Sequence, residues 1–233
     1  MERYSIITNK NPREIVLLRG SGCKWKKCTF CDYHLDFSLN EDENFKINSE
    51  ALSKVKGLYG RLEAINSGSF CDLDDKTIRL IIDTCIKNKI SIVHFECHYI
   101  HRAEVASIKR LFADNGITVK IKTGVETFDV NYREKVLKKG FGFATPMELA
   151  NYADEVCLLF GLTGQTEQSM INDIEIGLKY FDRVCVNIMT PNTTDVQPDK
   201  YVIQIFQSNI SEKYIDNNRV DILFENTDFG VGS

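Results

Sequence analysis

Residues 14–31 read EIVLLRGSGCKWKKCTFC, in which a short apolar run leads directly into a loop with three cysteines spaced C-x4-C-x2-C. The run Glu14–Arg19 has the length and composition of a buried strand. Three thiols on one short loop can face a single centre. Because a four-iron cluster normally takes four cysteines, a set of three leaves one iron open to an outside ligand. The loop therefore predicts metal or cluster chemistry on Cys23, Cys28 and Cys31.

Zinc is the alternative that the residues alone leave open. A structural zinc site needs a fourth Cys or His, and His34 lies three residues past Cys31. The five other cysteines occur singly, and an isolated cysteine commonly behaves as a small buried hydrophobe. We expect that role for Cys71, Cys85, Cys97, Cys157 and Cys185.

The composition is that of a globular protein, with 43% hydrophobic and 27% charged residues in 233. A net charge of −4 gives no whole-molecule electrostatic reason to bind a nucleic acid directly. The N-terminus lacks the apolar core of a signal peptide, and no apolar run reaches the roughly 18–20 residues of a bilayer span. We therefore expect a cytoplasmic protein without a membrane partner.

Apolar runs alternate with segments of helical period, which is the pattern of repeated β-α units with a parallel sheet. The predicted strands are Glu14–Arg19, Leu62–Ser67, Ser91–Cys97, Thr118–Gly124, Glu155–Gly161 and Arg183–Met189. The predicted helices are Ser49–Tyr59, Asp74–Asn88, His101–Asn115, Asp129–Lys139 and Thr166–Phe181. Six units are too few for a closed eight-unit barrel, so the expected fold is α/β, an open partial (β/α)6 barrel with parallel strands. Ligands of such folds bind at the carboxyl ends of the strands.

No linker rich in Pro, Gly or Ser interrupts the chain, so we expect a single domain over residues 1–233. Its core covers about residues 14–195, and residues 196–233 form a C-terminal extension. The tail near Asp228 and Phe229 could fold over the site as a lid, or fray.

The cysteine loop resembles the defining loop of the radical S-adenosylmethionine (SAM) superfamily, in which an aromatic residue precedes the last cysteine. Phe30 fills that position, although the commonest family spacing is C-x3-C-x2-C. Further stretches resemble the superfamily's strand-end signatures in the same order along the chain. The first is Asn66-Ser67-Gly68-Ser69-Phe70, and the second is Gly124-Val125-Glu126-Thr127, which leads into a segment that ends Lys138-Lys139-Gly140-Phe141. The other two are Leu159-Phe160-Gly161-Leu162-Thr163-Gly164-Gln165-Thr166 and Pro191-Asn192-Thr193-Thr194.

The resemblance implies an enzyme with a [4Fe-4S] cluster on the three cysteines and SAM on its open iron. In this superfamily one electron splits SAM to methionine and a 5′-deoxyadenosyl radical, which removes a hydrogen atom from the substrate. A flavodoxin or ferredoxin-type protein is the implied electron donor. The residues that the resemblance places against the cofactor are Phe30, Asn66, Ser67, Gly68, Ser69, Glu126 and Leu162.

The chain carries no RNA-binding module and no second cysteine cluster, so a small molecule is the expected substrate and a lyase the expected enzyme class. Polar residues at or near the strand ends are the candidates for substrate binding: Glu96, His98, Asn187, Asn192 and Asp228. Glu96 and Glu126 are the candidate catalytic residues. The alternatives are a radical SAM enzyme for another metabolite, an activase that makes a glycyl radical on a protein, and a zinc-binding domain.

Overall fold

The computed structural model describes residues 1–232, except for the side chain of His34, so the possible role of His34 as a zinc ligand lies outside the described part. Two compact units emerge from the contacts between residues. The first contains residues 1–26, 33–122 and 229–232, and the second contains residues 27–32 and 123–228. The expected single domain stays a prediction, and each unit is described by itself below.

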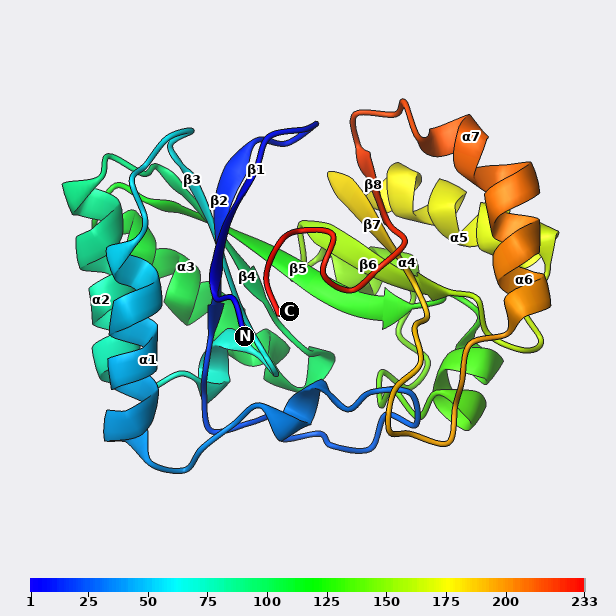
Figure 1. The fold of residues 1–233 in the computed structure, drawn as a ribbon, viewed down its shortest axis with the longest axis horizontal. Coiled ribbons are helices and arrows are strands. Elements are labelled where there is room, and N and C mark those ends of the chain that lie inside the picture. The colour runs from blue at the N-terminus through cyan, green and yellow to red at the C-terminus, as the bar shows by residue number, and fades with distance from the viewer. Residues whose placement is uncertain (233) are drawn as a thin grey trace. The chain divides into compact units, whose positions relative to one another are not determined.

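The first unit is built on β1 (Tyr4–Ile7), β2 (Arg13–Leu18), β3 (Arg61–Asn66), β4 (Ile92–Glu96) and the beginning of β5 (Thr118–Glu126). β1 pairs antiparallel with β2, and β2 to β5 are parallel neighbours in chain order. The helices between them are α1 (Glu41–Ser53), α2 (Asp75–Lys87) and α3 (Val105–Ala113), with short helices η1 (Tyr33–Leu35), η2 (Phe70–Asp72) and η3 (Tyr99–Glu104) (Figure 1).

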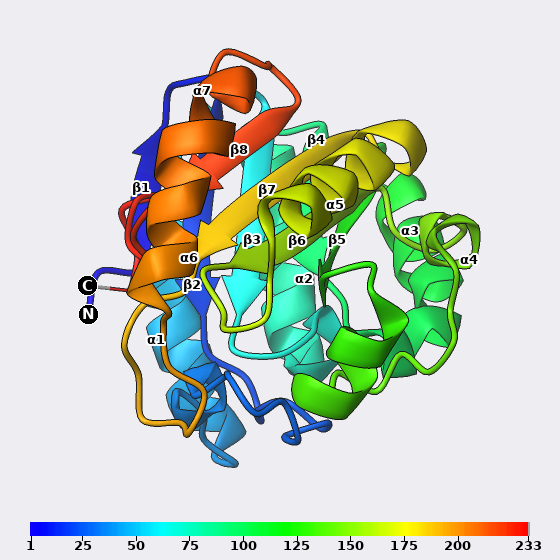
Figure 2. The same cartoon turned by 90° about the vertical axis from the view of Figure 1, so that its right-hand side faces the viewer.

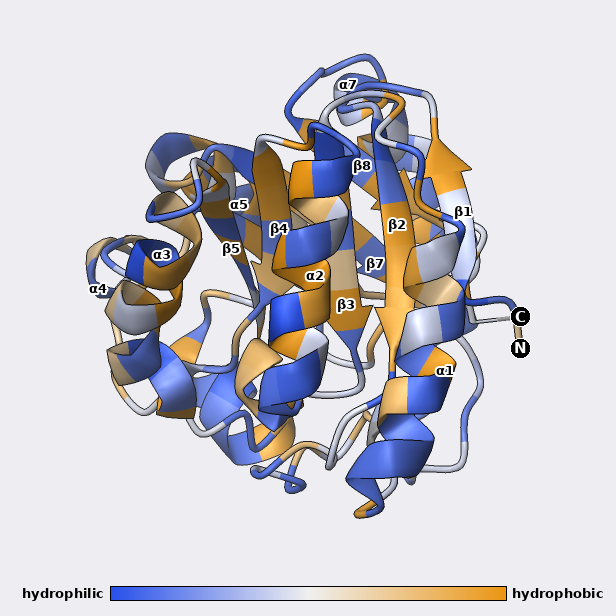
Figure 3. Cartoon of the chain, turned by 90° about the vertical axis from the view of Figure 1, so that its left-hand side faces the viewer, coloured by the Kyte–Doolittle hydropathy of each residue, from blue (hydrophilic) through white to orange (hydrophobic). Residues whose placement is uncertain are grey.

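Burial of apolar side chains explains how these helices lie on the sheet. Figure 3 shows α1, α2 and α3 along one face of β2, β3 and β4, whose residues are mostly apolar. In α2, Ile78, Ile81, Ile82 and Cys85 share the buried face, as their spacing predicts. The parallel strands of this unit therefore end at one edge, where the loops that follow β2, β3 and β4 gather.

A network of buried charges lies on the strands of the first unit. Glu63 accepts hydrogen bonds from Arg13 and Lys122, and all three side chains are almost completely buried. Burial alone would raise the pKa of Glu63, but Lys122 and Arg13 hold that pKa well below its usual range. The ring of Phe229 lies 5.0 Å from the Arg13 guanidinium carbon, so the C-terminal tail covers this network.

The tail itself is packed in the first unit. Val231 is buried with Ile7 and Ile15, and the backbone N–H of Gly232 donates to the carbonyl of Glu2 (2.9 Å). Of the two expectations for the tail, fraying is wrong for residues 229–232, because apolar contacts and a backbone hydrogen bond hold them in place.

The second unit contains β6 (Glu155–Phe160), β7 (Arg183–Ile188) and β8 (Val220–Leu223), all parallel, together with the last residues of β5. Its helices are α4 (Pro146–Ala150), α5 (Glu167–Tyr180), α6 (Lys200–Ile205) and α7 (Ser211–Tyr214), with π-helical turns η4 (Tyr132–Val136) and η5 (Phe206–Ile210). Figure 2 shows α5 and α6 over the strands of this unit. All six predicted strands are confirmed to within about two residues, and with them the expected α/β class.

Three of the predicted helices are wrong in their bounds. The helix expected over Ser49–Tyr59 is α1, which begins at Glu41 because Asn40 caps it by accepting from the Glu43 N–H, and it ends at Ser53. The helix expected over Asp129–Lys139 is only the π-helical turn η4, and Lys138 adopts a left-handed backbone conformation just after it. The helix expected to begin at His101 is preceded by the 3-10 turn η3, and α3 begins at Val105.

Candidate active site

The first part of the cysteine loop, residues 20–26, follows β2 in the first unit. The backbone N–H of Ser21 donates to the carbonyl of Asp72 (2.8 Å), and a side chain at Gly20 would overlap that carbonyl oxygen. Glycine at position 20 is what permits this close approach. The loop is therefore fixed to residue 72 shortly before Cys23, whose thiol is half-buried.

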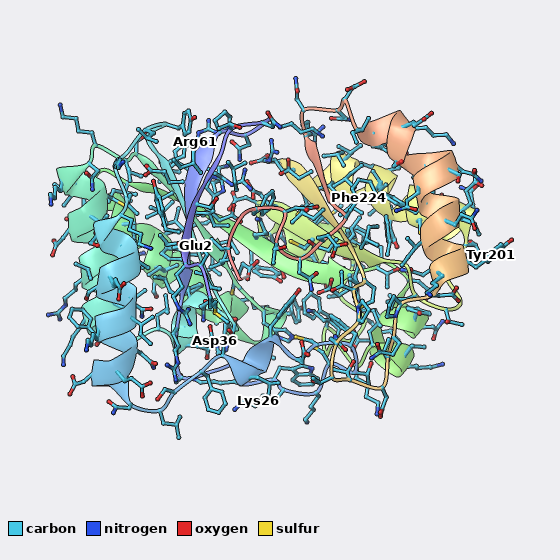
Figure 4. The ribbon with its side chains drawn as sticks, viewed as in Figure 1. Glu2, Lys26, Asp36, Arg61, Tyr201 and Phe224 are labelled. Atoms are coloured by element: carbon cyan, nitrogen blue, oxygen red, sulfur yellow. The ribbon has the colours of Figure 1, made fainter. Side chains whose placement is uncertain are left out.

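Aromatic rings flank the residues that follow Cys23. Trp25 stacks on His98, with ring centroids 5.7 Å apart, and Lys26 Nζ lies 4.5 Å from the centroid of the Phe37 ring. Figure 4 shows Lys26 at the end of the first unit where β2 ends, whereas Arg61, the first residue of β3, lies at the opposite end. The carboxyl ends of the strands in this unit thus carry the first part of the loop.

The loop at residues 66–72 packs against the start of the cysteine loop. Asn66, the last residue of β3, donates from Nδ2 to the Ser69 carbonyl (3.1 Å), and the Ser69 N–H donates to Asp72 Oδ2 (2.7 Å). A Cβ at Gly68 would overlap Asp72 Oδ2 and lie 3.1 Å from the Cys23 Cα. A side chain at position 68 would therefore separate the two loops, which explains the glycine.

Three buried polar atoms near this loop have no hydrogen-bond partner among the residues that the structure describes: Asn66 Oδ1, Asp72 Oδ1 and His101 Nε2. The three residues are between 3% and 9% exposed. Burial raises the pKa of Asp72, against the Ser69 N–H and the nearby cations, and burial lowers the pKa of His101. Buried polar atoms are normally paired, so two open acceptor oxygens suit a ligand that donates hydrogen bonds, such as an ammonium group.

Glu96 and His98 lie at the end of β4 in the same unit. Glu96 is the last residue of β4 and is half-buried. The His98 N–H donates to Ser69 Oγ (2.9 Å), and His98 Nδ1 accepts from the Ile100 N–H (3.3 Å). His98 and His101 are each 9% exposed, so both imidazoles are held inside the protein rather than on its surface.

The second part of the cysteine loop, residues 27–32, lies in the second unit and is held there by hydrogen bonds, including two from Thr193 to Asp32 Oδ2 (both 3.0 Å). Thr29 donates from its N–H to the Leu137 carbonyl (3.2 Å) and from Oγ1 to the Val136 carbonyl (2.7 Å). Asn192 donates from Nδ2 to the Phe30 carbonyl (2.6 Å). Segments far apart in the sequence thus hold the turn between Cys28 and Cys31.

An apolar cluster supports this turn. Phe30 and Leu162, both predicted to contact the cofactor, are buried in it, and Cys28 and Cys31 pack against it. Its other buried members are Leu137, Leu159 and Met189. The aromatic residue before the last cysteine is therefore an anchor for the loop.

Glu126 lies at the end of β5 and forms an ion pair with Lys139, with 2.7 Å between Glu126 Oε1 and Lys139 Nζ. Both side chains are nearly buried. Glu126 has a φ of +69°, a left-handed conformation that is uncommon for a residue with a side chain and is found where the surroundings enforce it. The structure thus pairs a predicted site residue with a lysine that the sequence did not single out.

The remaining predicted residues of the second unit differ in how their polar groups are used. Asn187 lies on β7 and is half-buried. Asn192 also accepts through Oδ1 from Thr194 (2.9 and 2.8 Å), so its amide serves the loop. Asp228 accepts from the N–H groups of Phe224 (2.7 Å) and Glu225 (3.0 Å) and so closes the turn after β8. Their binding roles stay predictions.

The donor set fits an iron–sulfur cluster in chemistry. All eight cysteines are thiols rather than disulfides, and the three of the loop are each half-buried. Within the described part of the chain, no three His, Cys, Asp or Glu side chains gather closely enough to hold a metal ion. No helix in the described part of the chain is long and apolar enough to cross a bilayer.

Asp72, His101 and Lys139 were given no site role in the sequence analysis. Asp72 follows Ser69 by three positions, the spacing of a capping pair, and that signal could have indicated it. Lys139 sits in a charged segment whose pattern is typical of an exposed surface, so nothing local distinguishes it from Lys138.

Comparison with solved structures decides the family. A structure titled "queuine lyase from Clostridium spiroforme bound to SAM and queuine" is 41% identical to this chain, covers 100% of both chains and superposes with a TM-score of 0.95. The chain belongs to the queuine lyase family. The likeness confirms the radical SAM type of fold, the partial (β/α) barrel, that the sequence predicts. No family model and no curated protein matches the sequence. A sporulation-specific glycosylase of Bacillus subtilis aligns at 8% identity over 88% of this chain and 78% of its own, with a TM-score of 0.33 that carries no weight.

Proposed function

We propose that this chain is a radical SAM lyase that cleaves a carbon–nitrogen bond of the queuine base and releases 7-aminomethyl-7-deazaguanine. One observation carries the proposal, the 41% identity and TM-score of 0.95 over the full length of both chains with a queuine lyase bound to SAM and queuine. A full-length match of that closeness does not favour the glycyl-radical activase, the zinc-binding domain or another metabolite.

Cys23, Cys28 and Cys31 would hold the [4Fe-4S] cluster of such an enzyme. When bound, the cluster and SAM would supply radical chemistry for removing a hydrogen atom from the cyclopentenediol arm of queuine. The protein fixes the loop. Hydrogen bonds from Ser21 to Asp72 hold its first part, and those from Thr29 and Asn192 hold its second part.

The loop at residues 66–72 is the proposed site for the methionine ammonium of SAM. The open acceptors Asn66 Oδ1 and Asp72 Oδ1 match the donors of an ammonium, and the glycine at position 68 lets the backbone of residues 67–69 approach Cys23. Glu126 and Leu162 would contact the ribose, carboxylate or adenine of SAM, and Phe30 supports the turn beneath them. A hydrogen bond to a charged group contributes about 1.5–3 kcal/mol.

Queuine offers an amino group, ring N–H groups and a diol, all of which need polar partners in a pocket closed to water. Glu96 is the proposed acceptor for the N–H and amino groups of the deazaguanine edge, because a carboxylate only accepts hydrogen bonds. His98, Asn187 and Asp228 are proposed to bind the rest of the substrate, with Asn192 serving through the loop that it holds.

The electron would come from a flavodoxin or ferredoxin-type protein in the cytoplasm, where thiols stay reduced. This donor is inferred from the chemistry of the cofactor alone, because the cluster must receive an electron before SAM is cleaved. The product is a free base, so the enzyme acts on a precursor of tRNA modification and has no need to bind nucleic acid directly.

A pair of cysteine variants tests the proposal. Cys28→Ala should bind little iron and should not cleave SAM in the presence of queuine, because the cluster loses one of its three ligands. Cys85→Ala should keep full iron content and SAM cleavage. Cys85 is completely buried in α2, burial raises its thiol pKa to about 12, and its loss only leaves a small cavity. Full iron content together with SAM cleavage in the Cys28→Ala protein would contradict the proposal.

A further inference from the structure

Lys139 is a buried cation in the second unit whose position the proposed chemistry does not yet use. It is 9% exposed, and its ammonium lies 2.7 Å from Glu126 Oε1, 5.4 Å from the centroid of the Phe30 ring and 5.8 Å from that of Phe141. Burying an ammonium has a large desolvation cost unless charges or rings compensate it. Here a carboxylate and two aromatic faces do so.

The same ammonium lies near two of the cysteines that are proposed to hold the cluster. Thr29 and Phe30 lie between Cys28 and Cys31 in the sequence. Both cysteines pack against the apolar cluster that contains Phe30 and Leu137. Thr29 is hydrogen-bonded to residues 136 and 137, three and two positions before Lys139. Lys139 is thus held beside the turn that carries both sulfurs.

The electrostatics agree with this placement. Burial alone would lower the pKa of Lys139, but the carboxylate of Glu126 and the thiolates of Cys28 and Cys31 raise it above its usual value. Lys139 is therefore charged at neutral pH.

The backbone around the pair is shaped to hold it. Glu126 adopts its left-handed conformation at the end of β5, and a Cβ at Gly124 would come within 2.5 Å of Glu126 Oε1 and 3.2 Å of Lys139 Nζ. The strained backbone of Glu126 is thus kept where it places the carboxylate against the Lys139 ammonium, and Gly124 leaves the space that both groups need.

We propose that Lys139 and Glu126 form an electrostatic pair that sets the reduction potential of the cluster on the cysteine loop. Reduction adds one negative charge to the cluster. The ammonium of Lys139 stabilises that charge and raises the potential, and the carboxylate of Glu126 opposes it and limits the rise. The pair acts through charge, without covalent chemistry. The inference rests only on the cluster in the proposed function and not on the identity of the substrate.

Coulomb's law gives the scale of the effect. For charges less than 10 Å apart at an effective dielectric constant near 20, removing one charge changes the ratio of reduced to oxidised cluster at a fixed potential by on the order of tenfold. For a one-electron couple that is about 59 mV. A shift of this size is measurable.

The test is a redox titration of the full chain, reconstituted anaerobically with iron and sulfide and kept free of SAM, with the reduced cluster followed by electron paramagnetic resonance. Four variants are compared with the unchanged protein: Lys139→Gln, Lys139→Arg, Glu126→Gln and Lys135→Gln. Lys135 is an exposed lysine four residues before Lys139 and is the matched control. Omitting SAM ensures that an altered contact to SAM cannot mimic a charge effect.

Lys139→Gln should lower the reduction potential of the cluster, and Glu126→Gln should raise it. Each should change the ratio of reduced to oxidised cluster at a fixed potential by on the order of tenfold. Lys139→Arg and Lys135→Gln should leave the reduction potential near that of the unchanged protein. Opposite shifts are the signature of charge, because a merely structural role would move both potentials the same way. If Lys139→Gln binds no cluster, the reduction potentials of Glu126→Gln and Lys139→Arg test the inference instead.

An unchanged or lowered potential in Glu126→Gln, or a potential in Lys139→Arg as low as in Lys139→Gln, would overturn the inference. Opposite shifts in an enzyme that leaves queuine intact would uphold it while the lyase proposal fails. A protein that binds no cluster at all would overturn both.

Discussion

At the scale of single residues, Asp173 shows what a buried carboxylate does in this protein. It is 4% exposed on α5 and accepts from the backbone N–H of Phe128 (2.7 Å), just after β5. Burial raises its pKa to about 6, against the hydrogen bonds from Phe128 and Thr127. The carboxylate thus joins the helix to the segment that follows Glu126, and its charge lowers stability.

We predict that Asp173→Asn removes a pH dependence of stability. An unfolded Asp releases its proton near pH 4, whereas folded Asp173 holds it up to about pH 6. Between these values the folded state binds more protons, so the stability of the unchanged protein falls as pH rises, by about 2–3 kcal/mol. The variant lacks this loss, and its amide oxygen can still accept from Phe128.

The measurement is the free energy of unfolding of both proteins in urea, at steps between pH 4 and pH 7 and at equal iron content. The advantage of Asp173→Asn should grow from pH 4 to pH 6 and then level off. A difference that stays constant over this range would show that the carboxylate is not buried as described.

A site residue could be predicted from the sequence only where it belongs to a recognisable motif with a defined spacing. Cys23, Cys28 and Cys31 form a motif, and Glu126 belongs to a strand-end stretch with a family resemblance. Lys139 became visible only when folding brought it onto Glu126, because the pairing of two charges 13 positions apart leaves no local pattern. Asp72 does have a local signal, the capping spacing to Ser69, but its contact with the cysteine loop depends on two loops that meet in space.

At the scale of elements, strands were easier to predict than helices. Each predicted strand is a short apolar run between turns, and such a run indicates a buried strand without any knowledge of what packs against it. The start of α1 was predicted too late because its residues have little apolar periodicity and the start depends on one cap, the side chain of Asn40. β1 was missed because it is a four-residue edge strand defined mainly by its pairing with β2.

The packing of α5 on its strands gives a prediction at this scale. A Cβ at Gly177 would lie 2.7 Å from Val184 Cγ2 on β7 and 3.3 Å from Val156 Cγ1 on β6. Ala is the better helix former by about 1 kcal/mol, but overpacking against stiff β-branched side chains costs about 1–3 kcal/mol. Gly177→Ala should therefore destabilise the protein by up to about 2 kcal/mol, the balance of these two effects.

Urea unfolding midpoints check this prediction, with Asn172→Ala as the control on the exposed side of the same helix. The control should change stability by less than about 0.5 kcal/mol. If Gly177→Ala were as stable as the unchanged protein or more so, α5 could not approach β6 and β7 as closely as the glycine indicates.

At the scale of the whole molecule, the chain is one polypeptide that crosses between two compact units several times. The cysteine loop divides between them, with Cys23 in the first and Cys28 and Cys31 in the second, and the tail returns to the first unit after Asp228. Fold class and the place of the cysteine loop after the first parallel strand follow from the pattern of β-α units. That pattern cannot name a substrate, because substrate choice depends on a few polar side chains whose meeting depends on the complete fold.

The full-length match to a queuine lyase makes substrate identity the central claim. Anaerobic incubation of the reconstituted enzyme with SAM, a reductant and queuine, read by mass spectrometry, tests it most directly. The account predicts loss of queuine and formation of 7-aminomethyl-7-deazaguanine, accompanied by methionine and 5′-deoxyadenosine, and none of the deazaguanine product when SAM is omitted. Recovery of intact queuine, with SAM cleaved only in an uncoupled way, would contradict it.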